Sequence, residues 1–148
     1  MTGVVMERPA SVTVDGPLRR YGAIPWRKDP RGRTRVLLVT SLGRGRWIVP
    51  KGQPAKDRPA YLSAAMDAFE EAGVIGDIQT RPLVDYTYVR QTAHGDLQQC
   101  HVTVFGLRVR GTLTNWPERA QRMRSWFDAE EAAEIVDNAD LARTIRAL

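Results

Sequence analysis

The chain has 148 residues, of which 43% are hydrophobic and 26% are charged. This length suits one domain, and the composition excludes extended disorder, collagen-like and coiled-coil classes. No stretch approaches the ~18 uncharged apolar residues of a membrane-spanning helix. Residues Met1–Pro9 lack an apolar core, so no secretory signal is predicted, and the single cysteine, Cys100, cannot form an internal disulfide. We therefore expect a protein of the reducing cytoplasm.

Basic residues outnumber acidic ones by 22 to 17, for a formal net charge of +5. All but three of the basic residues are arginines, the exceptions being Lys28, Lys51 and Lys56. Arginine is well suited to forked contacts with phosphate and carboxylate groups. The excess indicates either an anionic partner, such as a nucleotide, an inositol phosphate or a nucleic acid, or an ordinary basic surface.

In chain order, residues 1–19 show little periodicity and are predicted to form a flexible N-terminal arm. Residues 20–148 are predicted to form a single domain, since no linker or repeat divides them. Apolar or alternating runs, separated by turn residues, predict strands in this domain. The expected strands are Tyr21–Arg27, Thr34–Thr40, Arg46–Pro50, Val84–Gln91, Cys100–Arg110 and Arg122–Phe127.

A change of period predicts a helix over about residues 58–72, with Asp57 as N-cap and Gly73 as the residue that ends it. Pro59 is tolerated in the first turn, where backbone N–H groups lack intrahelical partners. The apolar stripe expected to face the core consists of Leu62, Ala65, Phe69 and Ala72.

Two further helices are expected near the C-terminus, over Asp128–Val136 and Asn138–Leu148. The order of strands, one helix, more strands and then helices is typical of an α+β domain with a mixed sheet.

The predicted 58–72 helix also carries three acidic residues, Asp67, Glu70 and Glu71, at i, i+3 and i+4. Like charges at this spacing repel each other, and they lie at the helix end where the macrodipole disfavours anions. Oxygen ligands on one rigid face suit Mg²⁺ or Mn²⁺. The spacing alone is also compatible with a solvated acidic helix face.

The segment from Gly52 to Val74 resembles the Nudix box of the Nudix hydrolase superfamily. That box reads Gly, five residues, Glu, seven residues, Arg-Glu, an aliphatic residue, any residue, Glu-Glu, any residue, Gly and an aliphatic residue. Counted from Gly52, the matching positions are Glu70, Glu71, Gly73 and Val74, without insertion or deletion.

Four box positions differ: Arg58 replaces the first glutamate, Met66 the arginine, Asp67 the next glutamate and Ala68 the aliphatic residue. In the family the arginine orients the carboxylate helix, which a methionine cannot do. An aspartate retracts its carboxylate by about one C–C bond, and Mg²⁺ tolerates misplaced ligands poorly.

The resemblance implies a Nudix-type α/β/α sandwich, similar to a bacterial branch near the diphosphoinositol-polyphosphate and diadenosine-polyphosphate hydrolases. It extends to the Trp47–Gly52 entry and to Trp126-Phe127, which Glu130-Glu131-Ala132 follow. It implies that Mg²⁺ or Mn²⁺ is held by the Gly52 carbonyl and by Asp67, Glu70 and Glu71. It further implies hydrolysis of a diphosphate linkage in a nucleoside-diphosphate-X, dinucleoside polyphosphate or inositol pyrophosphate.

Five basic residues are candidates for binding the phosphates of such a substrate: Lys51, Arg46, Arg44, Lys56 and Arg90. Lys51 is the strongest, because it adjoins Gly52 in the loop that leads to the helix. The others also fit simple solvent exposure. Tyr86 and Tyr88 share one strand face and fit either stacking on a base or packing within the sheet.

Two functions of different classes follow. The first is a metal-dependent pyrophosphohydrolase acting on a phosphorylated small molecule. The second is a catalytically weakened Nudix-like domain that binds a nucleotide or a protein without turnover, which the substitutions at Arg58, Met66 and Asp67 favour. A basic nucleic-acid-binding domain is supported by charge alone, so no specific nucleic acid and no membrane partner is expected. A homodimer fits the resemblance.

Overall fold

A computed structural model describes residues 16–148, which form one mixed sheet flanked by three helices. The predicted N-terminal arm lies largely outside these residues, and the first strand already begins at Leu18. The strands are β2 (Leu18–Lys28), β3 (Thr34–Thr40), β4 (Trp47–Ile48), β5 (Lys51–Gly52), β6 (Val74–Gln91), β7 (Leu97–Thr112) and β8 (Arg124–Asp128). The helices are α1 (Ala60–Ala72), α2 (Ala129–Ile135) and α3 (Ala139–Arg146).

The main path of the sheet has the order β4-β3-β2-β7-β6, with β5 paired to β2 and β8 paired to β3. Strands β2 and β7 run parallel at its centre, while the other pairs are antiparallel. This mixture of parallel and antiparallel pairs confirms the predicted mixed sheet. A parallel pair needs a crossover connection, and the connection between β2 and β7 includes α1.

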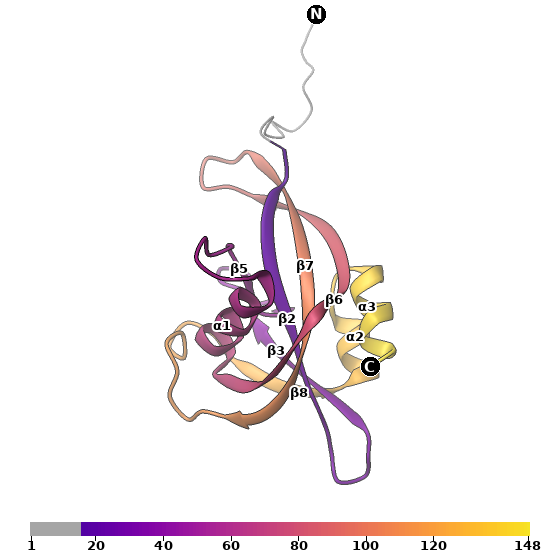
Figure 1. Cartoon of the computed structure of the whole chain (residues 1–148). Helices are drawn as coiled ribbons and strands as arrows, with labels where there is room; N and C mark the ends of the chain where they lie inside the picture. The colour runs from indigo at the N-terminus through magenta and orange to yellow at the C-terminus, as the bar shows by residue number, and fades with distance from the viewer. Residues whose placement is uncertain (1–15) are drawn as a thin grey trace, which may run out of the picture.

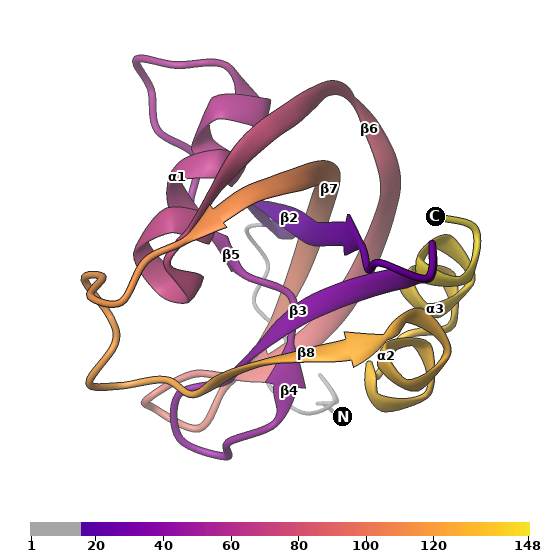
Figure 2. The ribbon, with the colours of Figure 1, turned by 90° about the horizontal axis from the view of Figure 1, so that it is seen from below.

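Helix α1 covers one face of the sheet, and α2 and α3 cover the other (Figures 1 and 2). Each face has its own hydrophobic core. One core contains Leu37, Val39, Phe105 and Leu107 beneath α1, and the other contains Ile24, Leu38, Val104 and Ile145 beneath the two C-terminal helices. The predicted α/β/α sandwich is therefore confirmed.

The start of α1 differs from the prediction. The helix begins at Ala60 and its N-cap is Pro59, with φ −65° and ψ 159°, in place of Asp57. A residue that precedes proline is disfavoured in the α region, so Arg58 stays outside the helix. The end was predicted correctly: Gly73 has a φ of 64° and donates its N–H to the carbonyl of Phe69 at 3.0 Å.

The buried side of α1 also differs from the predicted stripe. Ala64, Ala68 and Ala72 are fully buried against the sheet, whereas Leu62 is 41% exposed. Phe69, which was predicted to be buried, lines an outward-facing apolar groove with Leu62. The stripe was correct for Ala72 and wrong for Leu62, because small side chains let the helix approach the sheet closely, which a count of large apolar residues does not anticipate.

Strands β6 and β7 are longer than the predicted 84–91 and 100–110. β6 begins at Val74, directly after α1, and its pairing with β7 is interrupted by three register shifts. Of the predicted strand Arg46–Pro50, only Trp47–Ile48 forms a strand, β4, and a second short strand, β5, follows at Lys51–Gly52. Pro50 has no N–H to donate to a ladder, and it lies between them.

The C-terminal helices agree with the prediction. Asp128 precedes α2 and its N–H is accepted by the Glu131 side chain at 3.3 Å, and Asn138 caps α3 by accepting from the Leu141 N–H at 3.0 Å. None of the helices described in residues 16–148 is both long and apolar enough to cross a bilayer.

Candidate functional site

Asp67 of α1 lies directly against Gly52 of β5. A Cβ atom built on Gly52 would come within 2.5 Å of Oδ1 of Asp67, so only glycine leaves room for this carboxylate. Oδ2 of Asp67 is buried and has no hydrogen-bond partner among the described residues. Burial, together with the neighbouring charges of Glu71 and Glu70, raises the pKa of Asp67 to about 7. An orphaned acidic oxygen packed against a glycine suits a bound cation.

Glu71 is buried one turn further along α1 and faces the same segment. Its Oε1 accepts the backbone N–H of Lys51 at 3.3 Å, and its Oε2 lies 3.8 Å from Nη2 of Arg122. Burial raises the pKa of Glu71 to about 7, although Arg122 and the Lys51 N–H both oppose this shift. Two carboxylates of α1 therefore converge on β5.

Glu70, the third acid of α1, is exposed, in contrast to Glu71. Its carbonyl accepts the N–H of Glu118 at 3.0 Å, and its charge contributes to the raised pKa of Asp67. Within residues 16–148, no group of three or more His, Cys, Asp or Glu side chains is close enough together to hold a metal ion. The structure thus brings together Asp67, Glu71 and Gly52, with Glu70 at the rim.

Arg122 was not identified as a site residue from the sequence. Its side chain is only 10% exposed, and besides Glu71 it contacts Glu118, with Nε to Oε1 at 2.7 Å, and the Thr40 carbonyl, with Nη1 to O at 2.9 Å. The residue was assigned to a strand, Arg122–Phe127, but β8 begins at Arg124 and Arg122 precedes it. No local pattern links it to a helix about fifty residues earlier.

Two cations stand next to the acidic pair. Lys51 has its Nζ 5.1 Å from the ring centroid of Tyr88, and burial lowers the pKa of Lys51 to about 8, with Arg20 and Arg122 acting in the same direction and Glu71 opposing them. Arg20 of β2 is half-buried, and its Nε has no hydrogen-bond partner among the described residues. Sequence analysis selected Lys51 and missed Arg20, which lies one residue before the predicted strand Tyr21–Arg27 and inside the observed β2.

The other predicted phosphate contacts have no recorded contact with the acids. Arg46 pairs with Asp137 of the loop between α2 and α3, with Nη1 to Oδ2 at 3.4 Å. Arg44, Lys56 and Arg90 are exposed, and Arg90 lies on the same strand as Tyr88. Of the five candidates, Lys51 alone lies beside Glu71.

The two tyrosines have separate surroundings. Tyr86 is buried in the core under α3, whereas Tyr88 is half-buried beside Lys51. Their ring centroids are 6.3 Å apart at a tilt of 35°. Only Tyr88 therefore offers part of its ring to a ligand.

Two of the substituted box positions, Arg58 and Met66, line the outward-facing apolar groove. Arg58 pairs with Asp57, with Nε to Oδ1 at 3.4 Å, and it lines the outward-facing groove with Met66. Arg58 therefore does not compete with a cation for Asp67 and Glu71, an arrangement that sequence analysis could not determine.

The C-terminal end of α1 is held from outside the helix. The Trp116 indole N–H donates to the Glu71 carbonyl at 3.1 Å, and Arg124 Nη1 donates to the Ala72 carbonyl at 2.9 Å. The Arg124 guanidinium carbon lies 3.8 Å from the centroid of the Trp116 ring. The last turn of α1 contains no basic residue of its own. These donors offset the unfavourable placement of acids at a helix C-terminus.

Curated relatives and solved structures resemble this chain. No family model matches the chain. Nudix hydrolase 12 and Nudix hydrolase 16 of Arabidopsis thaliana, both mitochondrial, are 34% and 30% identical over 103 and 132 residues, covering 68% and 81% of this chain and 51% and 73% of the relatives. Diphosphoinositol polyphosphate phosphohydrolase 3-beta of Bos taurus is 32% identical over 104 residues, which is 68% of this chain and 59% of that protein. The chain spans about half the length of the first curated relatives that it matches.

Solved structures share the fold. An Ap4A hydrolase of C. elegans superposes with a TM-score of 0.62 at 19% identity, over 88% of this chain and 95% of that one. The NUDIX domain of Shewanella oneidensis NrtR, complexed with ADP ribose, gives a TM-score of 0.65 at 15% identity, over 90% and 88% of the two chains. At these identities the likeness concerns the fold alone.

Proposed function

The chain belongs to the Nudix hydrolase family, and on this premise we propose that it hydrolyses a diphosphate linkage with the aid of Mg²⁺ or Mn²⁺. The proposed substrates are nucleoside-diphosphate-X compounds, dinucleoside polyphosphates and inositol pyrophosphates. The relatives named as Nudix hydrolases and as a diphosphoinositol polyphosphate phosphohydrolase support this substrate class.

The observation that carries the proposal is the packing of Asp67 on Gly52. A buried carboxylate oxygen without a donor is costly unless a cation compensates it. Glu71 lies one turn along on the same side, and the raised pKa values of both acids reflect burial of negative charge with too little positive charge nearby. A divalent ion supplies that charge.

We assign the cation to Asp67 and Glu71, with the Gly52 carbonyl and Glu70 as further oxygen ligands. When bound, such an ion neutralises phosphate charge and lowers the pKa of a water molecule. Lys51 and Arg20 supply donors for the non-bridging phosphate oxygens, because both are positively charged and Nε of Arg20 has no protein partner among the described residues. Arg122 holds Glu71 in place as a positioning residue.

The test is turnover of a substrate panel with each metal, followed by chromatography of the products. The panel contains ADP-ribose, diadenosine tetraphosphate and an inositol pyrophosphate. Glu71→Gln is expected to lower kcat/KM by about a hundredfold or more, because a metal ligand is removed. Glu134→Gln, an exposed acid of α2, is the matched control and is expected to keep full activity. Activity that survives combined Glu70→Gln and Glu71→Gln substitution contradicts the proposal.

A second candidate is binding of a nucleotide or protein without turnover. Two observations favour it: within residues 16–148 no group of three acidic side chains is close enough to hold a metal ion, and Met66, at the box arginine position, is 39% exposed and lines the apolar groove. Thermal stabilisation by a panel compound with no product formed under any metal would select this function.

A further inference from the structure

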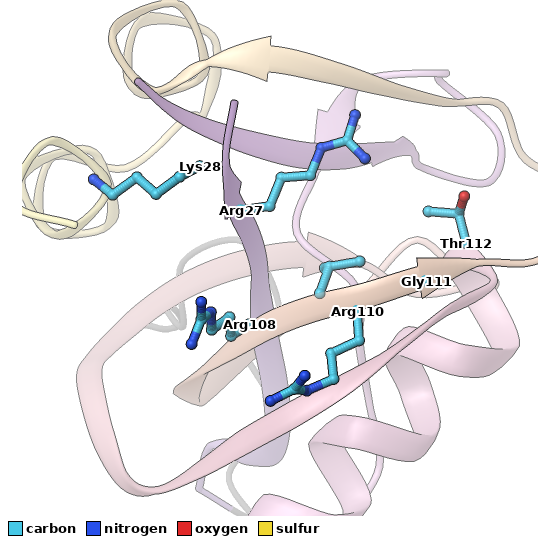
Figure 3. Close-up of a pocket in the computed structure, with 7 residues that line it drawn as sticks. Arg27, Lys28, Arg108, Arg110, Gly111 and Thr112 are labelled. Carbon is cyan, nitrogen blue, oxygen red and sulfur yellow. The ribbon is translucent and has the colours of Figure 1, made fainter. Parts of the chain in front are cut away.

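A cavity lined by four basic residues lies at the far end of the central strands. Its volume is about 320 Å³, and it is lined by Arg27 and Lys28 of β2 and by Arg108 and Arg110 of β7, with Val109, Gly111 and Thr112 completing the wall (Figure 3). Gly52 pairs with Tyr21, six residues before Arg27 on β2. At about 3.3 Å per residue, the cavity is about 20 Å from the acidic site. It is therefore a separate feature of the surface.

The sheet itself brings these cations together. β2 and β7 run parallel with Trp26 opposite Arg108, so the basic ends of both strands lie side by side. Opposite β7, Ile75 pairs with Gly111 and Gly76 with Val109, which leaves Arg110 as the extra residue of a β-bulge. Bulges change the direction of side chains and are frequent at sites with a function.

Acidic groups balance only part of this charge. Nε of Arg110 lies 2.6 Å from Oδ2 of Asp77, but Arg108 has no ion pair or side-chain hydrogen bond within residues 16–148. Lys28 donates to the Thr34 hydroxyl at 2.6 Å, and Arg27 lies over the Trp126 ring at 4.0 Å. Neither of these partners carries a negative charge.

The nearest basic neighbour on β3 does not reduce the excess. Arg35 of β3 lies opposite Arg27 of β2 in the register of the two strands. Its guanidinium is held by Asp29 and Asp128, with Nη1 to oxygen distances of 3.9 and 3.5 Å. Those two carboxylates are therefore engaged by Arg35, and Arg33 also pairs with Asp29 at 3.6 Å. Three of the four cavity cations remain without a carboxylate.

We propose that this cavity binds a condensed phosphate group, either as free inorganic polyphosphate or as the phosphate chain of a nucleotide. Three arginines with forked donors and one lysine around a single cavity match a ligand that carries several charges on a short chain of oxygens. None of the described lining residues is aromatic, so the site recognises the phosphate chain and offers no stacking surface for a base. This site is independent of the proposed hydrolysis, because it shares no residue with the acidic site.

The experiment measures binding of tripolyphosphate, ATP and orthophosphate to the full chain by calorimetry, with EDTA present to remove divalent metal. We expect tripolyphosphate to bind more tightly than orthophosphate, and salt to weaken the binding. In Lys28→Gln/Arg108→Gln, removal of two cations is expected to raise the Kd for tripolyphosphate by about tenfold or more. Similar affinity for ATP and tripolyphosphate would show that the phosphate chain alone determines binding. Tighter binding of ATP would identify a nucleotide as the ligand, and tighter binding of tripolyphosphate would identify inorganic polyphosphate.

Two controls separate the cavity from other basic sites. Arg81→Gln removes one exposed charge from β6 outside the cavity and is compared with Arg108→Gln alone. Lys51→Gln removes the cation beside Glu71, so binding that survives in this variant is distinct from substrate binding. Unchanged affinity in Lys28→Gln/Arg108→Gln, an equal loss in Arg81→Gln, or a loss confined to Lys51→Gln would each overturn the proposal. Circular dichroism melts confirm that every variant is folded.

Discussion

Arg122 and Glu71 meet at 3.8 Å with both side chains about nine-tenths buried, at 10% and 9% exposed. The guanidinium comes from the segment before β8, whereas the carboxylate comes from α1, so the pair joins the two sides of the candidate site. Arg122 also holds the Thr40 carbonyl and the Glu118 carboxylate.

Arg122→Met is expected to destabilise the fold by about 3 kcal/mol, because it leaves Glu71 buried without its cation. Urea unfolding measures this change. In the variant, the pKa of Glu71 should rise further, so the pH profile of kcat should move to higher pH. Arg122→Lys keeps the charge and is expected to restore part of both properties. A variant with unchanged stability and pH profile would show that the pair does not act on Glu71.

Gly52→Ala is expected to abolish or strongly weaken Mn²⁺ binding. The added methyl would lie 2.5 Å from Oδ1 of Asp67, and this carboxylate would have to turn away from β5. Electron paramagnetic resonance of Mn²⁺ reports the free ion directly. Gly111→Ala is the control, since its methyl meets Ile75 at an ordinary contact distance of 3.6 Å. Equal Mn²⁺ affinity in both variants would argue against a cation beside Asp67.

The metal-free protein is expected to lose stability as the pH rises from about 4 to about 7. The pKa values of Asp67 and Glu71 are about 7 in the fold against 3.8 and 4.5 in their ordinary state, so the unfolded chain releases these protons first. Their contribution is complete below about pH 4 and is lost as the pH approaches 7. Thermal melts in EDTA measure this slope, and Asp67→Asn should make it shallower.

The same acids predict the opposite trend with metal. A divalent ion binds the ionised carboxylates, so the increase in Tm caused by Mn²⁺ should be larger at pH 8 than at pH 6. An increase that does not depend on pH would mean that the ion binds elsewhere.

Trp116→Phe is expected to cost about 1 kcal/mol of stability, since it removes the indole N–H that donates to the Glu71 carbonyl while it keeps an aromatic ring beside Arg124. Trp47→Phe, at a tryptophan with no recorded side-chain hydrogen bond among the described residues, serves as the matched comparison. Hydrogen exchange at the last turn of α1 should increase in Trp116→Phe alone.

The sequence was sufficient to predict the layers of the fold, the end of α1 at Gly73 and the capped C-terminal helices, because these depend on local patterns. It was insufficient to orient α1, since Leu62 and Phe69 dominate any count of apolar residues while three alanines make the contact with the sheet. Membership of the Nudix family was correctly predicted from the matching glycines and glutamates, despite the substitutions at Arg58 and Met66.

The candidate site was predicted only where its residues are close in sequence. Asp67, Glu71, Lys51 and Gly52 belong to one segment with a recognisable spacing. Arg20 and Arg122 come from strand and loop segments far from it, and only the folded sheet brings them to the acids. Their roles in hydrolysis remain predictions, as do those of Arg44, Arg46, Lys56 and Arg90.

The alanine face of α1 has a consequence for evolution of the chain. The methyl groups of these alanines set how closely α1 packs on the sheet, and therefore how far Asp67 reaches toward β5. Enlarging Ala64 or Ala68 by a single carbon would lift the whole acidic turn away from the glycine beneath it. The position of the candidate site thus depends on the smallest side chains of the helix.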